Sequence, residues 1–156
     1  MKGGRQKELP LDNRAVDLGI VDSLVQLSFA VQSVLARVAE GYELSLVQVR
    51  LLGVLRDCEP GMMELAGFLS LDKSSMTGLV DRAEGRGLVQ RSASPEDRRM
   101  VRVALTDAGR EVARAFAAQV ERELQVLVEH LNADERKRLS VLASRVAVDY
   151  ARAARR

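Results

Sequence analysis

The sequence predicts a mainly α-helical fold that carries a small β-wing. Apolar residues recur at helical spacing along most of the 156-residue chain. One short stretch near residue 103 alternates apolar and polar side chains, as a half-buried strand does. Glycine, proline and short polar residues separate these segments and indicate turns. At this length we expect a single domain, residues 1–156.

The composition is that of a soluble globular protein. Hydrophobic residues make up 47% of the chain and charged residues 29%, while the formal net charge is only +2. Total charge therefore does not identify a nucleic-acid-binding protein. Between Arg82 and Arg102, however, six arginines stand against three acidic residues, which gives this segment a local basic edge. With no tryptophan, the chain has few aromatic surfaces for stacking single-stranded bases, so duplex is the favoured partner.

We expect a cytoplasmic protein without membrane contact. Cys58 is the single cysteine, which excludes an internal disulfide framework and fits a reducing compartment. By our reading no apolar run approaches the roughly 20 residues needed to cross a bilayer. The first residues, MKGGRQKELP, lack the apolar centre of a signal peptide and are expected to form a frayed arm.

Three helices are predicted in the first half of the chain. The first ends at Gly41 and carries an apolar seam at helical spacing. The second begins after Ser45, a plausible N-cap, and ends before Glu59-Pro60-Gly61; a short third helix covers 62–69. The seam of the first helix consists of Ile20, Leu24, Leu27, Val31, Val34 and Val38.

The fourth predicted helix follows Asp72, which is placed to cap its free amides. Its positions 76, 79, 80 and 83 are apolar and share one face, so they must contact the core. The opposite face carries short polar side chains where a surface helix normally has Glu and Lys. Short side chains allow a helix backbone to approach DNA closely. This outer face consists of Ser74, Ser75, Thr77, Gly78, Asp81 and Arg82.

A hairpin and two long helical segments follow. Residues 88–91 are predicted as one strand, 92–96 as a turn, and Val101, Val103 and Leu105 as the inward positions of a second strand. Thr106 is a plausible cap for a long helical section, and Asn132 with Glu135 restarts the chain in a last helix. The order of these parts predicts a winged helix-turn-helix lobe at 45–105, with helical dimerisation regions at 12–40 and 106–156.

The chain resembles the multiple antibiotic resistance regulator (MarR) family. The resemblance is continuous from about Leu44 to Glu111 and rests on LSLVQVRLLGVL, MELAGFLSLDKSSMTGLVDRAEGRGLVQR and SPEDRRMVRVALTDAGRE. It implies a triangular homodimer that binds pseudo-palindromic double-stranded promoter DNA, in most members as a repressor. Many members release DNA when a small, often aromatic or phenolic, molecule enters a cleft between the dimer base and the winged lobe. Others respond to oxidation of a cysteine.

The expected DNA contacts lie on the fourth helix and on the wing. The hydroxyl side chains of the helix can reach phosphates or base edges, and Arg82 can pair with guanine or a phosphate. Their alternative role is capping and solvated surface. The resemblance implies that Arg99 enters the minor groove and that Asp97 braces it, with Arg98 as a neighbour. The full predicted set is Lys73, Ser74, Ser75, Thr77, Gly78, Arg82, Asp97, Arg98 and Arg99.

Apolar seams in both terminal helical regions favour a homodimer. A helix in a monomer of this size has little reason to carry apolar residues to both chain ends, although packing into the chain's own core is the alternative. The candidate dimer residues are Leu18, Leu139, Leu142, Val146 and Tyr150.

We find no sequence basis for an enzyme, a metal site or a cofactor. His130 is the only histidine, and no cluster has metal-ligand spacing. Cys58 lies near the end of the second helix and is expected to be buried and structural rather than redox-active. Two other functions remain open: a ligand-independent regulator or activator, and a winged helix that binds a protein partner.

Overall fold

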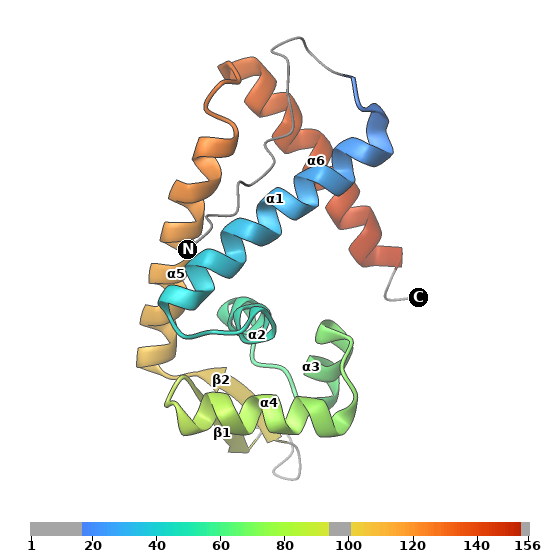
Figure 1. The fold of residues 1–156 in the computed structure, drawn as a ribbon. Coiled ribbons are helices and arrows are strands. Elements are labelled where there is room, and N and C mark those ends of the chain that lie inside the picture. Colours follow the sequence, from blue (N-terminus) through green and yellow to red (C-terminus); the bar gives the residue numbers. More distant parts are fainter. Residues whose placement is uncertain (1–16, 94–100, 154–156) are drawn as a thin grey trace, which may run out of the picture.

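The computed structural model describes residues 17–93 and 101–153 and confirms the predicted fold class. These residues form six helices and one two-stranded antiparallel sheet (Figure 1). The elements, in chain order, are α1 (Gly19–Gly41), α2 (Leu46–Asp57), α3 (Met62–Leu69), α4 (Lys73–Gly85), β1 (Val89–Ala93), β2 (Val101–Leu105), α5 (Asp107–Leu127) and α6 (Ala133–Ala153).

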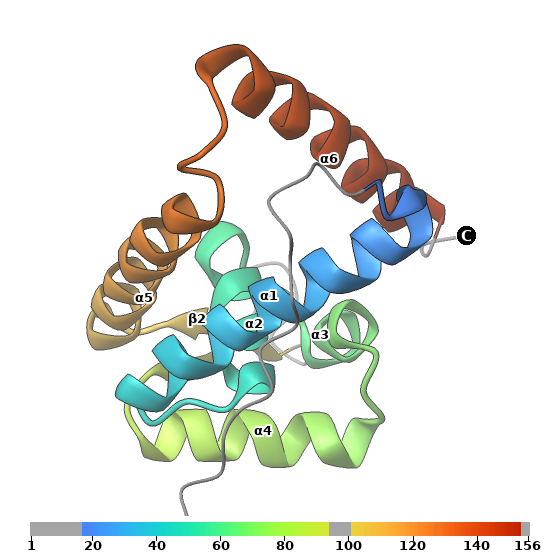
Figure 2. The same ribbon diagram turned by 45° about the horizontal axis from the view of Figure 1, so that its top comes forward.

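Helices α2, α3 and α4 gather with the sheet at one end of the molecule, and α1, α5 and α6 extend from it (Figures 1 and 2). We call residues 45–105 the winged lobe. Helix α1 packs along α5, and α2 contacts α1, α3, α5 and β2. Helix α6 turns back from the far end of α5 and stands apart from the winged lobe (Figure 2).

Side chains cap the N-termini of three helices at the positions that the sequence predicted. Ser45 accepts a hydrogen bond from the amide of Gln48, and the Gln48 side chain accepts one from the amide of Ser45, which completes a capping box. Thr106 accepts from the amide of Gly109 at the start of α5. Asn132 and Glu135 form the same reciprocal pair before α6. Such caps satisfy amides that the first helical turn leaves unpaired.

The core lies in the winged lobe and continues into the facing parts of α1 and α5. Leu51, Leu65 and Val103 are completely buried. The edge of the core is closed where the ring of Tyr42, which follows α1, meets Phe116 of α5 edge to face, with ring centres 5.8 Å apart. The apolar face of α4 is buried as predicted and consists of Met76, Leu79, Val80 and Ala83.

The hairpin differs from the expected alternation of buried and exposed residues. Strands β1 and β2 pair in antiparallel register from Val89 opposite Leu105 to Ala93 opposite Val101. Val101, predicted to face inward, is exposed, whereas Ala104, predicted to face outward, is buried. The hairpin base lies against α5 and α2 and is covered on both faces, while its outer end extends past them.

One glycine fixes how α5 leaves the hairpin. A Cβ atom on Gly109 would lie 1.8 Å from the carbonyl oxygen of Leu88, far inside any permitted contact. The first turn of α5 therefore approaches the backbone before β1 more closely than any side chain allows. This contact joins the winged lobe firmly to α5.

Two helices leave their apolar residues uncovered. Helix α6 has no buried residue, and Leu139, Leu142, Val146 and Tyr150 are all exposed. In the first half of α1 most large apolar side chains are exposed as well, including Ile20 at 74%. The intramolecular-core alternative for the predicted dimer residues, Leu18 included, is therefore wrong for this chain alone.

The structure corrects two further expectations. Helix α1 is long and apolar enough, by length and composition only, to cross a membrane, contrary to our reading that no such segment exists. Its charged residues, Asp22, Arg37 and Glu40, lie toward the helix ends, which leaves an uncharged centre. Cys58, expected to be buried, is exposed, because it lies just past α2 where the chain leaves the core; its thiol donates to the Val54 carbonyl at 3.4 Å.

Candidate nucleic-acid interface

Helix α4 holds the predicted helix contacts on its outer surface. Its four buried apolar residues anchor it to the core, so the opposite side is turned to solvent. Lys73, Ser74, Ser75, Thr77 and Arg82 are exposed there, and Gly78 is half-buried between them. The structure thus brings together six of the nine predicted contact residues. The other three, Asp97, Arg98 and Arg99, lie outside the described residues.

A compact hydrogen-bond network surrounds Asp72 at the start of α4. The hydroxyls of Ser74 and Ser75 donate to its two carboxylate oxygens at 2.6 and 2.5 Å, and the amide of Ser75 donates at 2.9 Å. The hydroxyl bonds from Ser74 and Ser75, followed by the amide bond, hold the pKa of Asp72 well below its usual range. The carboxylate is therefore ionised at neutral pH.

Farther along the helix, Thr77 donates its hydroxyl to the carbonyl of Lys73 at 2.9 Å. The carbonyl of Arg82 accepts from the amide of Arg86, but its guanidinium makes no hydrogen bond or ion pair with another residue that the structure describes. Its guanidinium lies over Gly78, since a Cβ added there would stand 3.3 Å from its terminal nitrogen. Ser74, Ser75, Gly78 and Arg82 thus border one hollow of about 330 Å³.

Two arginines of the predicted basic edge have structural roles. Arg91 of β1 forms ion pairs with Asp81, at 2.6 Å, and with Glu84, both on α4. Burial alone would lower the pKa of Arg91, but the hydrogen bonds to these carboxylates outweigh it and raise the pKa. The pairs hold β1 against the helix and remove one cation from the free surface of the basic edge.

Arg86, which ends α4, reaches the turn between α1 and α2. Its guanidinium donates to the carbonyls of Glu43, at 2.6 Å, and Tyr42, at 3.0 Å. Sequence reasoning missed this role, because main-chain carbonyls about forty positions away leave no local signal. Arg86 therefore fixes the end of α4 to the turn that follows α1.

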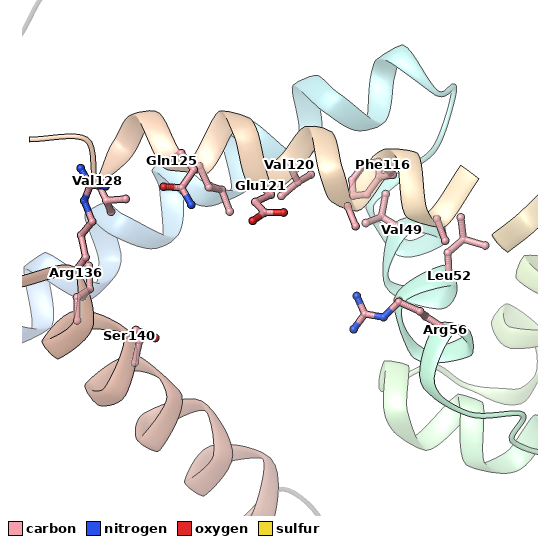
Figure 3. A pocket seen from close by; sticks show the side chains of 16 residues that line it. Val49, Leu52, Arg56, Phe116, Val120, Glu121, Gln125, Val128, Arg136 and Ser140 are labelled. Carbon is pink, nitrogen blue, oxygen red and sulfur yellow. The ribbon is translucent and has the colours of Figure 1, made fainter. Parts of the chain in front are cut away.

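A separate cavity of about 760 Å³ lies between α2, α5 and α6 (Figure 3). Leu52, Phe116, Val120 and Leu124 belong to its apolar wall. Its polar lining is sparse and comes from all three helices: Arg56 on α2, Glu121 and Gln125 on α5, and Arg136 and Ser140 on α6. In Figure 3 the Arg56 side chain extends from α2 into the space facing α6. Such a lining suits a small molecule with an apolar body and a few polar groups.

Arg136 also shapes the turn that carries α6 away from α5. It donates to the carbonyls of Leu131, at 2.9 Å, and Glu129, at 2.8 Å. The same residue therefore lines the cavity and braces the turn. Within residues 17–93 and 101–153, no group of three or more His, Cys, Asp or Glu side chains is placed to hold a metal ion.

Comparison with known proteins connects this geometry to one group of regulators. Residues 44–101 match the model of the MarR family. The chain is 35% identical over 95 residues to the HTH-type transcriptional repressor NicR of Pseudomonas putida; this covers 60% of the chain and 60% of NicR. It is also 35% identical over 85 residues to the multiple antibiotic resistance protein MarR of Escherichia coli, covering 54% and 59%. The curated relatives thus match over 54–60% of their own length.

A solved structure extends the likeness beyond the winged lobe. The apo form of wild-type MarR from E. coli superposes with a TM-score of 0.69 at 26% identity, over 83% of this chain and 98% of that chain. The likeness therefore covers more of the chain than the winged lobe alone.

Proposed function

The winged lobe of this chain belongs to the MarR family, and on that premise we propose that the protein is a dimeric, sequence-specific DNA-binding transcriptional regulator. The observation that carries the proposal is the family match over residues 44–101. This segment contains α4, whose inner face is buried and whose outer face carries short polar side chains. In this proposal α4 enters the major groove of promoter DNA and the wing, with Asp97, Arg98 and Arg99, reaches the adjacent minor groove.

The uncovered apolar faces of α1 and α6 support a homodimer. Large contiguous apolar patches are uncommon on soluble monomers and mark interaction surfaces. Because the likeness to E. coli MarR extends beyond the winged lobe, we assign the faces to a second copy of this chain rather than to a membrane. The assignment keeps 12–40 and 106–156 as the dimerisation region, with Leu18, Leu139, Leu142, Val146 and Tyr150 in the contact.

We further propose that the protein represses transcription and releases its operator when a small, amphipathic, often aromatic or phenolic ligand binds. The cavity between α2, α5 and α6 supports this, because it joins the winged lobe to the predicted dimer base. A ligand that fits only one relative placement of these helices shifts the population toward that placement. The name of NicR, a transcriptional repressor, favours the same sign of regulation.

Selection of duplexes from a random library tests the central proposal. The purified chain should enrich an inverted repeat whose half-site centres lie about 10 base pairs apart, and its affinity should fall steeply with salt. Its mass in solution should be twice 17.2 kDa. A monomer that enriches no duplex at low ionic strength contradicts the proposal and favours a winged helix that binds a protein partner.

Calorimetry against phenols and aromatic carboxylates tests the ligand. We expect heat of binding with the wild type and none with Ala117→Phe, which places a ring in the cavity. Ala118→Phe, one position away and outside the lining, is the matched control. If no compound binds while the operator is still bound, the protein is a ligand-independent regulator.

A further inference from the structure

We propose that the first turns of α4 read bases that carry an amino group in the major groove, adenine or cytosine, and that Asp72 determines this preference. The inference rests on the proposed DNA-binding function and adds which atoms are recognised. Its basis is the direction of the hydrogen bonds around Asp72, Ser74 and Ser75.

A serine hydroxyl has one proton to donate and lone pairs that accept. In Ser74 and Ser75 that proton is given to Asp72, so each oxygen presents lone pairs to anything that approaches from outside. Thr77 likewise gives its proton to the carbonyl of Lys73. The hydroxyl-bearing part of the outer face therefore offers acceptors, although the residue types alone suggest mixed donors and acceptors.

The ionised state of Asp72 keeps the network in this direction. A carboxylate has no proton and can only accept, and it receives three hydrogen bonds from the first turn of α4. Turning either hydroxyl outward leaves a carboxylate oxygen without that strong, charge-assisted bond. Both hydroxyls are therefore held as acceptors when DNA approaches.

A surface that presents hydrogen-bond acceptors can bind only those DNA groups that donate a hydrogen bond. Phosphate oxygens, guanine N7 and O6, and thymine O4 are themselves acceptors, whereas adenine N6 and cytosine N4 are the donors in the major groove. The N-terminal residues of a recognition helix are those that contact base edges. Ser74 and Ser75 thus match bases that carry an amino group. The sequence alone predicted that these hydroxyls contact either phosphates or base edges, and the proposal excludes the phosphates. Donation to phosphate is left to cations such as Lys73 and Arg82.

Asp72→Asn is the sharpest variant, since asparagine also caps helices well and the change preserves size. Its side-chain NH₂ group donates instead of accepting, which releases at least one serine hydroxyl to donate outward. We expect the wild type to enrich A or C at the half-site positions sensitive to Ser74→Ala or Ser75→Ala. The Asp72→Asn protein should lose that preference and accept G or T there, with its thermal unfolding nearly unchanged.

Base analogues test the same contact atom by atom. Purine in place of adenine, or 2-pyrimidinone in place of cytosine, removes the amino group at one selected position. The affinity of the wild type should fall about five- to tenfold, the effect of one net hydrogen bond. Against Ser75→Ala or Ser74→Ala the same analogue should have little effect, because the acceptor is already missing.

The outcomes separate this inference from the proposed function. If neither the wild type nor the variants enrich any duplex, DNA binding itself fails. If a defined operator emerges but the serine-sensitive positions are G or T, or Asp72→Asn keeps the wild-type preference, the protein binds DNA and the acceptor readout is wrong. Loss of the A or C preference in Asp72→Asn, together with the analogue results, supports the assignment.

Discussion

The winged lobe and the terminal helices of this chain differ in how far their apolar residues are buried. In the winged lobe Leu51, Leu65 and Val103 are fully enclosed by elements of the same chain. In α6 no residue is buried at all, and Val146 and Tyr150 are 59% and 77% exposed. Amphipathic helices form in both regions, but only one region supplies its own partner surfaces.

The difference shows that periodicity alone does not say where an apolar face will be covered. The seam of α1 illustrates both situations within one helix: Val34 and Val38 are buried in the core, whereas Ile20 and Leu24 are exposed. The winged lobe is built to fold around its own interior. The outer half of α1 and the whole of α6 are built for a second surface, which we assign to another copy of the chain.

The largest expected effect comes from placing a charge on the uncovered face of α6. Leu142→Glu should convert the dimer to a monomer, because a carboxylate would be buried at the subunit contact. Specific operator binding should then drop to the non-specific level, about a thousandfold or more. Sedimentation and duplex titration measure the two changes.

Ser144→Glu, on the far side of the same helix turn, is the matched control and should stay dimeric. A Leu142→Glu protein that remains a dimer with unchanged operator affinity would show that α6 does not carry the contact.

Next in size is the loss of a buried side chain inside the winged lobe. Leu65→Ala should lower the free energy of unfolding by about 2–5 kcal/mol, because Leu65 is fully enclosed and its removal leaves a cavity. Met63, on the same helix, is 75% exposed, so Met63→Ala should change stability by no more than about 0.5 kcal/mol. Urea unfolding measures both. Equal effects from the two substitutions would mean that α3 does not pack as described.

A smaller effect, confined to recognition, is expected at the wing. Arg99→Ala should weaken operator binding by about 1–3 kcal/mol, through loss of a minor-groove contact, with little change in thermal unfolding or dimer mass. Arg114→Ala, an exposed arginine of α5 away from the wing, serves as the control for charge alone. Unchanged affinity of Arg99→Ala in a duplex titration would remove this residue from the interface.

The smallest expected effect concerns a helix cap. Ser45→Ala removes the side-chain acceptor of the capping box and should destabilise the protein by about 1 kcal/mol. Ser45→Asp supplies another acceptor and should restore most of the loss, as measured by chemical unfolding. If the aspartate variant is as unstable as the alanine variant, the cap is not the cause.

Much of the fold was predictable because its signals are local. Ser45, Asp72 and Thr106 stand where caps are needed, and the spacing of apolar residues gave the inner face of α4 correctly. The outer face of α4 was then predicted as the side opposite these apolar residues. Its six predicted contacts are gathered as expected, while their roles in DNA binding stay predictions.

The remaining features depend on contacts between distant parts of the chain. Arg86 and Arg91 were counted among the cations of a local basic edge, but Arg86 binds carbonyls of a distant turn and Arg91 pairs with carboxylates of α4. The exposure of Cys58 depends on where the chain departs from the core after α2. No spacing rule in the sequence reports these positions, because they are set by the packing of whole helices.

The anchorage of Arg86 has a mechanical consequence. Since its guanidinium binds the carbonyls of Tyr42 and Glu43, just beyond α1, we expect the end of α4 to move together with α1. Two subunits that tilt against each other along α1 would carry their α4 helices with them and alter the gap between them. If the distance between the two α4 helices of the proposed dimer changes by a few ångströms, it no longer matches the roughly 34 Å repeat of the double helix.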